Sequence, residues 1–157
     1  MNRLILCSGH TGQPGWLTLD RNPECQPDIL AAIPPLPAAV WARKWDEIEW
    51  IHGVGSLDPW QAHHVLAELH DVLAPEGKLV LEQPDLRRAA EAILRDDSLA
   101  WWMFGDPSHH DTGMMNRWAY TPETLKSALI GAGFTNIALL PAKYHSPSRD
   151  FRMEARP

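Results

Sequence analysis

The chain has 157 residues, of which 45% are hydrophobic and 22% charged, and its formal net charge is -6. These values are typical of one globular domain, here residues 1–157, with enough apolar side chains to form a buried core. The acidic balance and the lack of a dense cluster of Lys and Arg argue against a nucleic-acid partner, and no apolar run approaches the roughly 20 residues that span a bilayer.

The first predicted element is a strand at residues 4–9, an apolar run that breaks at Gly9. No cleavage site follows this run, so we interpret it as a strand and not as a signal peptide. Cys7 and Cys25 lack the spacing of metal ligands, so we expect two free thiols and a cytoplasmic location.

Three further strand-like segments follow, each bounded by turn residues, at residues 16–20, 28–33 and 45–51. The connections between the first three strands are too short for the helix that usually links adjacent parallel strands. We therefore expect either bare loops or one pair that is not parallel, and reduced helix cover on the N-terminal half of the sheet. Trp16, Trp41 and Trp45 are predicted to help cap the exposed face.

The clearest helix is predicted at residues 58–74. Asp58 is a suitable N-cap, Pro59 fits the first helical position, and Gln61 follows three residues after the cap. Apolar side chains then recur at helical spacing: Ala62, Val65, Leu66, Leu69, Val72 and Leu73. A proline and a glycine end this helix, and a strand at residues 78–82 follows, which together form half of a parallel crossover unit.

The rest of the chain continues this alternation of helices and strands. Helices are predicted from residue 85 and at residues 121–133, and short strands at residues 137–140 and 151–155. The aromatic segment at residues 101–104 is predicted to pack in the core, at the end of the second helical region. The pattern as a whole indicates an α/β layer fold.

Several segments, taken in order, match one family. The residues that carry the match are the turn Cys7-Ser8-Gly9, the run from Pro14-Gly15-Trp16 to Asp20, the segment Trp45-Asp46-Glu47-Ile48, the stretch at residues 68–79 and the late helix at residues 120–134. With residues 27–33, these segments cover nearly the whole chain. The sequence resembles the class I S-adenosylmethionine-dependent methyltransferases, and within them a compact branch like methyltransferase type 11.

The resemblance implies a Rossmann-like three-layer sandwich with a mostly parallel sheet, and a methyl transfer from S-adenosylmethionine to a nucleophile without a metal. In such sheets ligands lie beyond the carboxyl ends of the strands. Gly9 would lie against the methionine end of the cofactor, and Asp20 would accept hydrogen bonds from the ribose. The full set of cofactor-binding residues that the resemblance implies is Cys7, Ser8, Gly9, His10, Asp20, Ala32, Ile33 and His52.

Three positions depart from the family pattern. Cys7 replaces the first glycine of the turn, Ala32 replaces an acid on the adenine side, and Gly55-Ser56 replace a Glu-His pair. These departures, together with the thin helix cover, support an alternative function, in which a catalytically degenerate methyltransferase-like fold acts as a binding or assembly module. A second copy or a partner chain would then cover the exposed sheet face.

Histidines supply the remaining candidates. His52 is a candidate general base, since imidazole exchanges protons near neutral pH, or a wall of the site; the alternative is a structural histidine. Asp20 is likewise either a ribose ligand or a turn residue beside Asn22. Neighbouring histidines point apart on a helix or strand, so no metal site is predicted. The substrate-side residues are predicted to be His109, His110, Arg117 and Trp118, facing a small-molecule or sugar-like acceptor.

Overall fold

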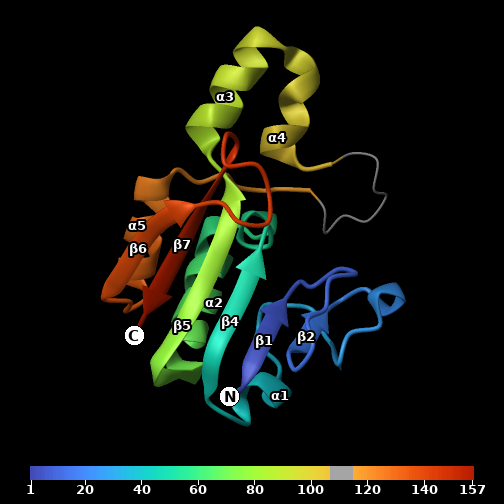
Figure 1. The fold of residues 1–157 in the computed structure, drawn as a ribbon, viewed down its shortest axis with the longest axis vertical. Helices are drawn as coiled ribbons and strands as arrows, with labels where there is room; N and C mark the ends of the chain where they lie inside the picture. Colours follow the sequence, from blue (N-terminus) through green and yellow to red (C-terminus); the bar gives the residue numbers. More distant parts are fainter. Residues whose placement is uncertain (107–114) are drawn as a thin grey trace.

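The computed structural model describes residues 1–106 and 115–157. Its centre is a seven-stranded sheet in the order β3-β2-β1-β4-β5-β7-β6 (Figure 1). The strands are β1 (Arg3–Leu6), β2 (Leu17–Asp20), β3 (Ile29–Leu30), β4 (Trp45–Ile51), β5 (Leu73–Pro84), β6 (Asn136–Pro141) and β7 (Asp150–Arg156). β1 to β5 pair in parallel, while β7 runs antiparallel to both of its neighbours.

Five α-helices and three short 3-10 turns connect the strands in the described part of the chain. The helices are α1 (Ala38–Trp41), α2 (Pro59–Val72), α3 (Leu86–Arg95), α4 (Trp101–Phe104) and α5 (Pro122–Gly131), and the turns are η1 (Pro23–Cys25), η2 (Val54–Ser56) and η3 (Asp97–Ala100). α2 begins as its sequence predicts, with the Asp58 N–H donating to Gln61 Oε1 at 3.2 Å in a capping box. β5 follows α2 directly, so the predicted strand at residues 78–82 is longer than expected.

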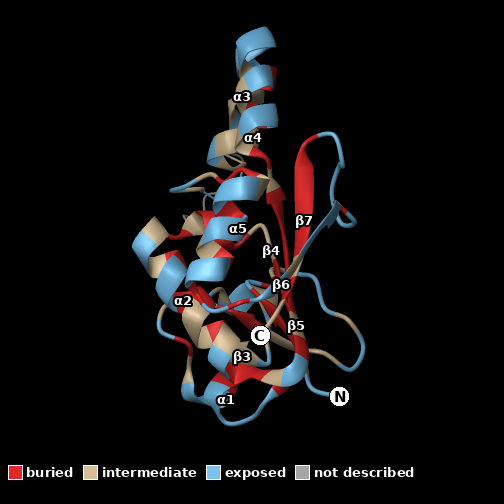
Figure 2. Cartoon of the chain, turned by 90° about the vertical axis from the view of Figure 1, so that its left-hand side faces the viewer, coloured by how far each residue is buried: buried red, intermediate tan, exposed pale blue. Residues whose placement is uncertain are grey.

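The apolar side chains that point to one face of the sheet form the core. Register partners share a face of a sheet, so Leu6, Leu19 and Trp50 lie side by side on it. The stripe that the sequence predicts on α2 packs against them, together with Leu125 and Leu129 of α5. Figure 2 shows these helices on one side of the sheet, with their buried residues turned toward it.

The opposite face has no helix packed on it within residues 1–106 and 115–157 (Figure 2). Charged side chains cover it instead, and Lys78 pairs there with Glu47 at 2.8 Å and with Glu154 at 3.7 Å. The Rossmann-like α/β fold and the mostly parallel sheet are confirmed, but the second helical layer of the expected sandwich is replaced by loops. The physical reason is the short connections β1–β2 and β2–β3, which contain no α-helix: the first is a loop and the second holds only the 3-10 turn η1. This agrees with the predicted alternative of loops between parallel strands.

The three tryptophans do not all cap this face. Trp16 does contribute, because its ring lies 5.3 Å from the guanidinium of Arg3. Trp45 is instead fully buried in the helix-side core, where its Nε1 donates to the Val40 carbonyl at 2.9 Å. Trp41 is 45% exposed on α1, the helix that packs on the other side. The prediction was therefore wrong for Trp41 and Trp45. An irregularity between Trp45 and Glu47 breaks the alternation of β4, so the Trp45 ring lies on the helix side, and Trp41 belongs to α1, which packs on that same side.

α3, η3 and α4 form an arm that extends past the sheet (Figure 1). Trp101 and Phe104 on α4 are 40% and 53% exposed, so the expected core packing of residues 101–104 is wrong. Because the arm extends beyond the sheet, α4 has little apolar surface of the sheet to pack against. In the described ranges, no helix has both the length and the apolar character needed to cross a bilayer.

Candidate functional site

The strand order places one natural crevice at the carboxyl ends of β1 and β4. These two strands are neighbours, yet the chain leaves β1 toward β2 on one side and leaves β4 toward β5 on the other. The loops therefore diverge above the junction and leave room between them, which is where open α/β sheets bind ligands. The residues that follow the two strands are Cys7 and His52.

The turn after β1 has an unusual backbone. Cys7 and Gly9 both adopt a left-handed conformation, with φ of 51° and 54°. The Ser8 N–H between them donates to the Leu19 carbonyl at 3.1 Å and ties the turn to β2. A Cβ built on Gly9 meets nothing within 4 Å, so the glycine is needed for its backbone angle and the space beside it is open. A ligand at this turn could therefore approach the Gly9 backbone without meeting a side chain.

Cys7 is strained at a position where the family pattern has glycine. The residue as a whole is exposed, while the surrounding protein atoms desolvate its thiol enough to raise the pKa to about 11. The thiol is therefore protonated at neutral pH and is a poor nucleophile.

We expect Cys7→Gly to raise the free energy of unfolding by about 0.5–1 kcal/mol. Relief of the left-handed strain contributes roughly 1–2 kcal/mol, and the greater freedom of glycine in the unfolded chain offsets about 0.5–1 kcal/mol of this gain. Urea unfolding measures the change. Cys25→Gly, at a residue without a positive φ, is the matched control and should lower stability. A lower free energy of unfolding in Cys7→Gly would contradict the inference that the left-handed backbone at Cys7 is strained.

Asp20 ends β2 beside this turn and is only 9% exposed. Its Oδ2 accepts from the Gly9 N–H at 2.8 Å, and its Oδ1 accepts from the Asn22 N–H at 2.9 Å. Gly9 and Asp20 are thus brought together, as the sequence predicts, and they touch directly. The Asn22 bond also realises the turn role of Asp20. Because each carboxylate oxygen has two lone pairs, both oxygens retain capacity to accept from a ligand hydroxyl.

The other predicted cofactor residues lie around the same edge of the sheet. Ser8 is buried, whereas His10 is exposed, with its Nε2 4.0 Å from the Cys25 thiol. Ala32 and Ile33 follow the two-residue strand β3, two strands away from β1, and Ala32 is exposed. The structure brings Cys7, Gly9 and Asp20 to one place and sets Ala32 and Ile33 further along the edge.

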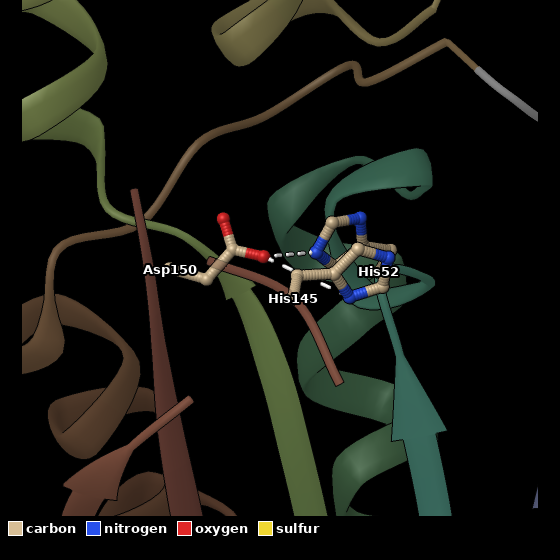
Figure 3. Close-up of side chains that lie close together, drawn as sticks. All are labelled: His52, His145 and Asp150. Atoms are coloured by element: carbon tan, nitrogen blue, oxygen red, sulfur yellow. Dashed lines mark hydrogen bonds and ion pairs between the residues drawn. The ribbon is translucent and has the colours of Figure 1, made fainter. Parts of the chain in front are cut away.

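His52 has partners that the sequence did not indicate. Like Cys7, it adopts a left-handed backbone, with φ of 55°, and its N–H donates to the Glu82 carbonyl at 2.8 Å. Its Nε2 lies 2.6 Å from Asp150 Oδ2, and its ring stacks on that of His145 with centroids 3.9 Å apart (Figure 3). The three side chains come from the end of β4, the β6–β7 loop and the start of β7.

Two carboxylates position this cluster. Glu82 is fully buried on β5, and its oxygens accept from the N–H groups of Lys143, Tyr144 and His145 at 2.7–3.2 Å. Asp150 is also buried and pairs with the Arg149 guanidinium. Glu82 therefore fixes the loop that carries His145, since backbone donors tied to a buried carboxylate cannot exchange with water.

The charges set the protonation of the cluster. Burial alone would raise the pKa of Asp150, but hydrogen bonds from His52 and Arg149 outweigh it and hold the pKa below its usual value. Desolvation, followed by the charge of His52, lowers the pKa of His145. At neutral pH Asp150 is thus an ionised carboxylate and His145 a neutral imidazole. The His52 Nε2–H is the donor to Asp150.

A pocket opens beside His52. Its cavity volume is about 10 Å³, which is room for about one water molecule, and it is lined by His52, Gly55, Gln83, Pro84, Leu86, Ala89, Trp102, Met103, Asn116, Trp118 and Ala119. Gln83 is 3% exposed, and its Nε2 has no hydrogen-bond partner within the described ranges. A buried donor without a partner costs free energy unless a ligand or water accepts from it.

The predicted substrate-side residues are only partly placed. His109 and His110 lie outside the described residues. Trp118 is 50% exposed and lines the pocket, and its N–H donates to the Gly55 carbonyl at 3.1 Å. Arg117 turns away from the pocket lining and pairs with Asp58 at 3.3 Å, so it anchors its segment to the start of α2.

Sequence reasoning missed His145, Asp150 and Gln83. The one local signal was Glu82, an acid at the end of the apolar run Leu79–Leu81 in a central strand. A charge in such a place is rarely buried without partners. Its partners lie about 60 residues away along the chain, as the contact separations show, so no sequence spacing could reveal them.

No protein-family model matches the sequence, and no curated protein matches it. Solved structures do match. A S-adenosylmethionine-dependent methyltransferase from Clostridium acetobutylicum ATCC 824 superposes with a TM-score of 0.68 at 12% identity, covering 99% of this chain and 83% of that one. A SAM-dependent methyltransferase from Archaeoglobus fulgidus gives a TM-score of 0.66 at 13% identity, covering 99% and 86%.

A third match is the glycopeptide N-methyltransferase MtfA complexed with sinefungin, with a TM-score of 0.68, 13% identity and coverage of 99% and 86%. At these identities the likeness establishes the fold. The chain has the fold of the class I methyltransferases.

Proposed function

We propose that this chain, with its class I methyltransferase fold, binds S-adenosylmethionine at the carboxyl ends of β1 and β2 and transfers the methyl group to a small acceptor. The observation that carries the proposal is the pairing of the open Gly9 turn with the buried Asp20 carboxylate, whose atoms are 2.8 Å apart. An adenosyl ligand needs both a hollow against the backbone and a hydroxyl acceptor beside it.

The residues present fit this cofactor. The space beside Gly9 receives no side chain, and Asp20 keeps lone pairs for two ribose hydroxyls. The backbone of Gly9 and His10 would hold the methionine end, Asp20 the ribose, and Ala32 and Ile33 the adenine side. When bound, the sulfonium supplies an activated methyl group. The contribution of the protein is to position donor and acceptor in line, because the transfer needs proximity more than proton transfer.

The pocket beside His52 is the proposed acceptor site. His52 belongs both to the crevice at the end of β4 and to the pocket lining, so an acceptor there borders the proposed cofactor site. Trp102 and Trp118 supply flat apolar walls, and the unpartnered Gln83 Nε2 supplies a donor. The proposed acceptor is a small planar or sugar-like molecule that carries a hydrogen-bond acceptor. Because the cavity volume of about 10 Å³ holds about one water molecule, lining side chains would have to move apart for it to enter.

Isothermal titration calorimetry with S-adenosylmethionine and S-adenosylhomocysteine tests the proposal. We expect saturable binding of both ligands with one site per chain. S-adenosylhomocysteine is the informative second ligand, because it lacks the methyl group and binds without reaction. Absence of heat with either ligand at millimolar concentration contradicts the transferase proposal and leaves the alternative, a module that keeps the fold without its cofactor.

A further inference from the structure

We infer that His52, His145 and Asp150 bind a divalent transition-metal ion such as Zn²⁺. One ligand atom from each residue can be chosen so that all three lie within 4.8 Å of one another. Two imidazole nitrogens and one carboxylate oxygen are the donor set of many zinc sites, with a fourth position left for water or substrate. This inference is independent of the proposed transferase activity, since an ion could bind whether or not the cofactor does.

Binding an ion requires the His145 side chain to move, because the two imidazole rings are stacked at 17° and their in-plane lone pairs do not converge. Bonds of about 2.0–2.1 Å at tetrahedral angles place neighbouring ligand atoms roughly 3.3 Å apart. His52 Nε2 and Asp150 Oδ2 are now 2.6 Å apart, and His145 Nδ1 and the same oxygen are 3.9 Å apart. One contact must open and the other must close, each by well under 1 Å. The ligand atoms as a set span up to 4.8 Å, so the two imidazole nitrogens must also approach each other, by up to about 1.5 Å. The His145 side chain, which the β6–β7 loop carries, would do so by rotating its ring out of the stack to aim its lone pair at the ion.

The ion would replace a proton. In the metal-free state the His52 Nε2–H donates to the Asp150 carboxylate at 2.6 Å. On binding, that proton leaves to solvent and both atoms donate lone pairs to the ion. Metal sites commonly compete with protons in this way. In the metal-bound state His52 is a ligand through Nε2, so Nδ1 is the only ring atom left to face a substrate or water.

The cluster is held by contacts that serve no evident purpose in packing alone. A left-handed backbone at a histidine costs of order 1–3 kcal/mol and is found most often at functional sites, and His52 has φ of 55°. Glu82 anchors the backbone of His145. Arg149 donates to both oxygens of Asp150, through Nε to Oδ1 and through Nη2 to Oδ2 at 3.0 Å, and Oδ2 also faces the imidazoles. Such outer contacts orient metal ligands.

The local charge favours a cation. The buried carboxylates Glu82 and Asp150 both approach His145 Nδ1, at 3.5 and 3.9 Å. Two guanidinium groups offset part of this negative charge: Arg149 pairs with the Asp150 carboxylate, and Arg88 donates to the Asp150 carbonyl at 3.0 Å. The site is also accessible, because the side chains of His52 and His145 are 30% and 42% exposed. An ion can therefore enter without unfolding, and it would lie at the mouth of the pocket that His52 lines.

Titration of ZnCl₂ into the chain, without S-adenosylmethionine and at neutral pH, tests the inference by calorimetry. We expect one Zn²⁺ per chain. His145→Ala should weaken binding by more than the roughly 10- to 100-fold that loss of an outer contact costs. His145 is a loop residue, so this variant should fold, and thermal melting checks that it does. His64→Ala, at an exposed histidine of α2, is the matched control and should bind as the wild type does.

The thiols are the competing ligands, since Cys25 lies 4.0 Å from His10. Cys25→Ser should leave Zn²⁺ binding unchanged, and Co²⁺-loaded protein should show d–d absorption without a thiolate charge-transfer band. Equal affinity in His145→Ala, loss of binding in Cys25→Ser, or no binding at all overturns the inference. Asp20→Asn separates the two proposals, because it should leave Zn²⁺ binding unchanged while it weakens the binding of S-adenosylmethionine.

Discussion

Asp20→Asn is expected to weaken the binding of S-adenosylhomocysteine by roughly 10- to 100-fold. Hydrogen bonds to a charged acceptor contribute about 1.5–3 kcal/mol each, and about 1.4 kcal/mol corresponds to a factor of ten in affinity. Asparagine keeps the volume and one acceptor oxygen for the bond from Gly9 or Asn22, so the turn should survive. The loss of affinity then measures the contribution of the Asp20 carboxylate to binding the ribose, and calorimetry gives its size.

The matched control is Asp71→Asn, because Asp71 lies on α2 with a side chain 66% exposed and far from the β2 edge. It should bind the ligand as the wild type does. If Asp20→Asn binds equally tightly while its melting temperature is unchanged, then Asp20 is a turn residue alone, and the proposed ribose contact is wrong.

The second large effect concerns stability. Trp45→Ala should lower the free energy of unfolding by about 3–5 kcal/mol, because a fully buried indole leaves a large cavity and strands the Val40 carbonyl. Trp41→Ala should change it by no more than about 0.5 kcal/mol, since that ring is 45% exposed. Urea unfolding of both variants measures the difference.

Trp60→Ala serves as a further control, as Trp60 is 71% exposed at the start of α2. Its expected effect is as small as that of Trp41→Ala. A loss in Trp41→Ala as large as that in Trp45→Ala would contradict the exposure of Trp41, and a negligible loss in Trp45→Ala would contradict its assignment to the helix-side core.

The local sequence pattern was enough to predict those helices and strands whose sequence signals lie entirely within the element. The Asp58 capping box and the apolar stripe after it mark α2, and the strand-like run Trp45–Ile51 between turn residues marks β4, because each signal lies within one element. Gly9 and Asp20 were predicted as a pair, because the carboxyl ends of adjacent parallel strands meet at one edge.

The rest depended on contacts between distant segments. His52 meets Asp150 only because β7 inserts antiparallel between β5 and β6, 98 residues along the chain. The lack of helices on the second face of the sheet follows from the short β1–β2 and β2–β3 connections. Their shortness was visible in the sequence, but it left open whether the strands they join are parallel. Trp101 and Phe104 looked like core residues by composition, and their exposure follows from an arm that extends beyond the sheet.

A crystal structure of the chain with S-adenosylhomocysteine tests the central claim most directly. We predict that the ribose hydroxyls lie within hydrogen-bond distance of Asp20 and that the homocysteine end fills the open space beside Gly9. Ligand density that contacts neither residue, or a turn that stays closed by the Gly9–Asp20 bond while the ligand binds elsewhere, contradicts the account.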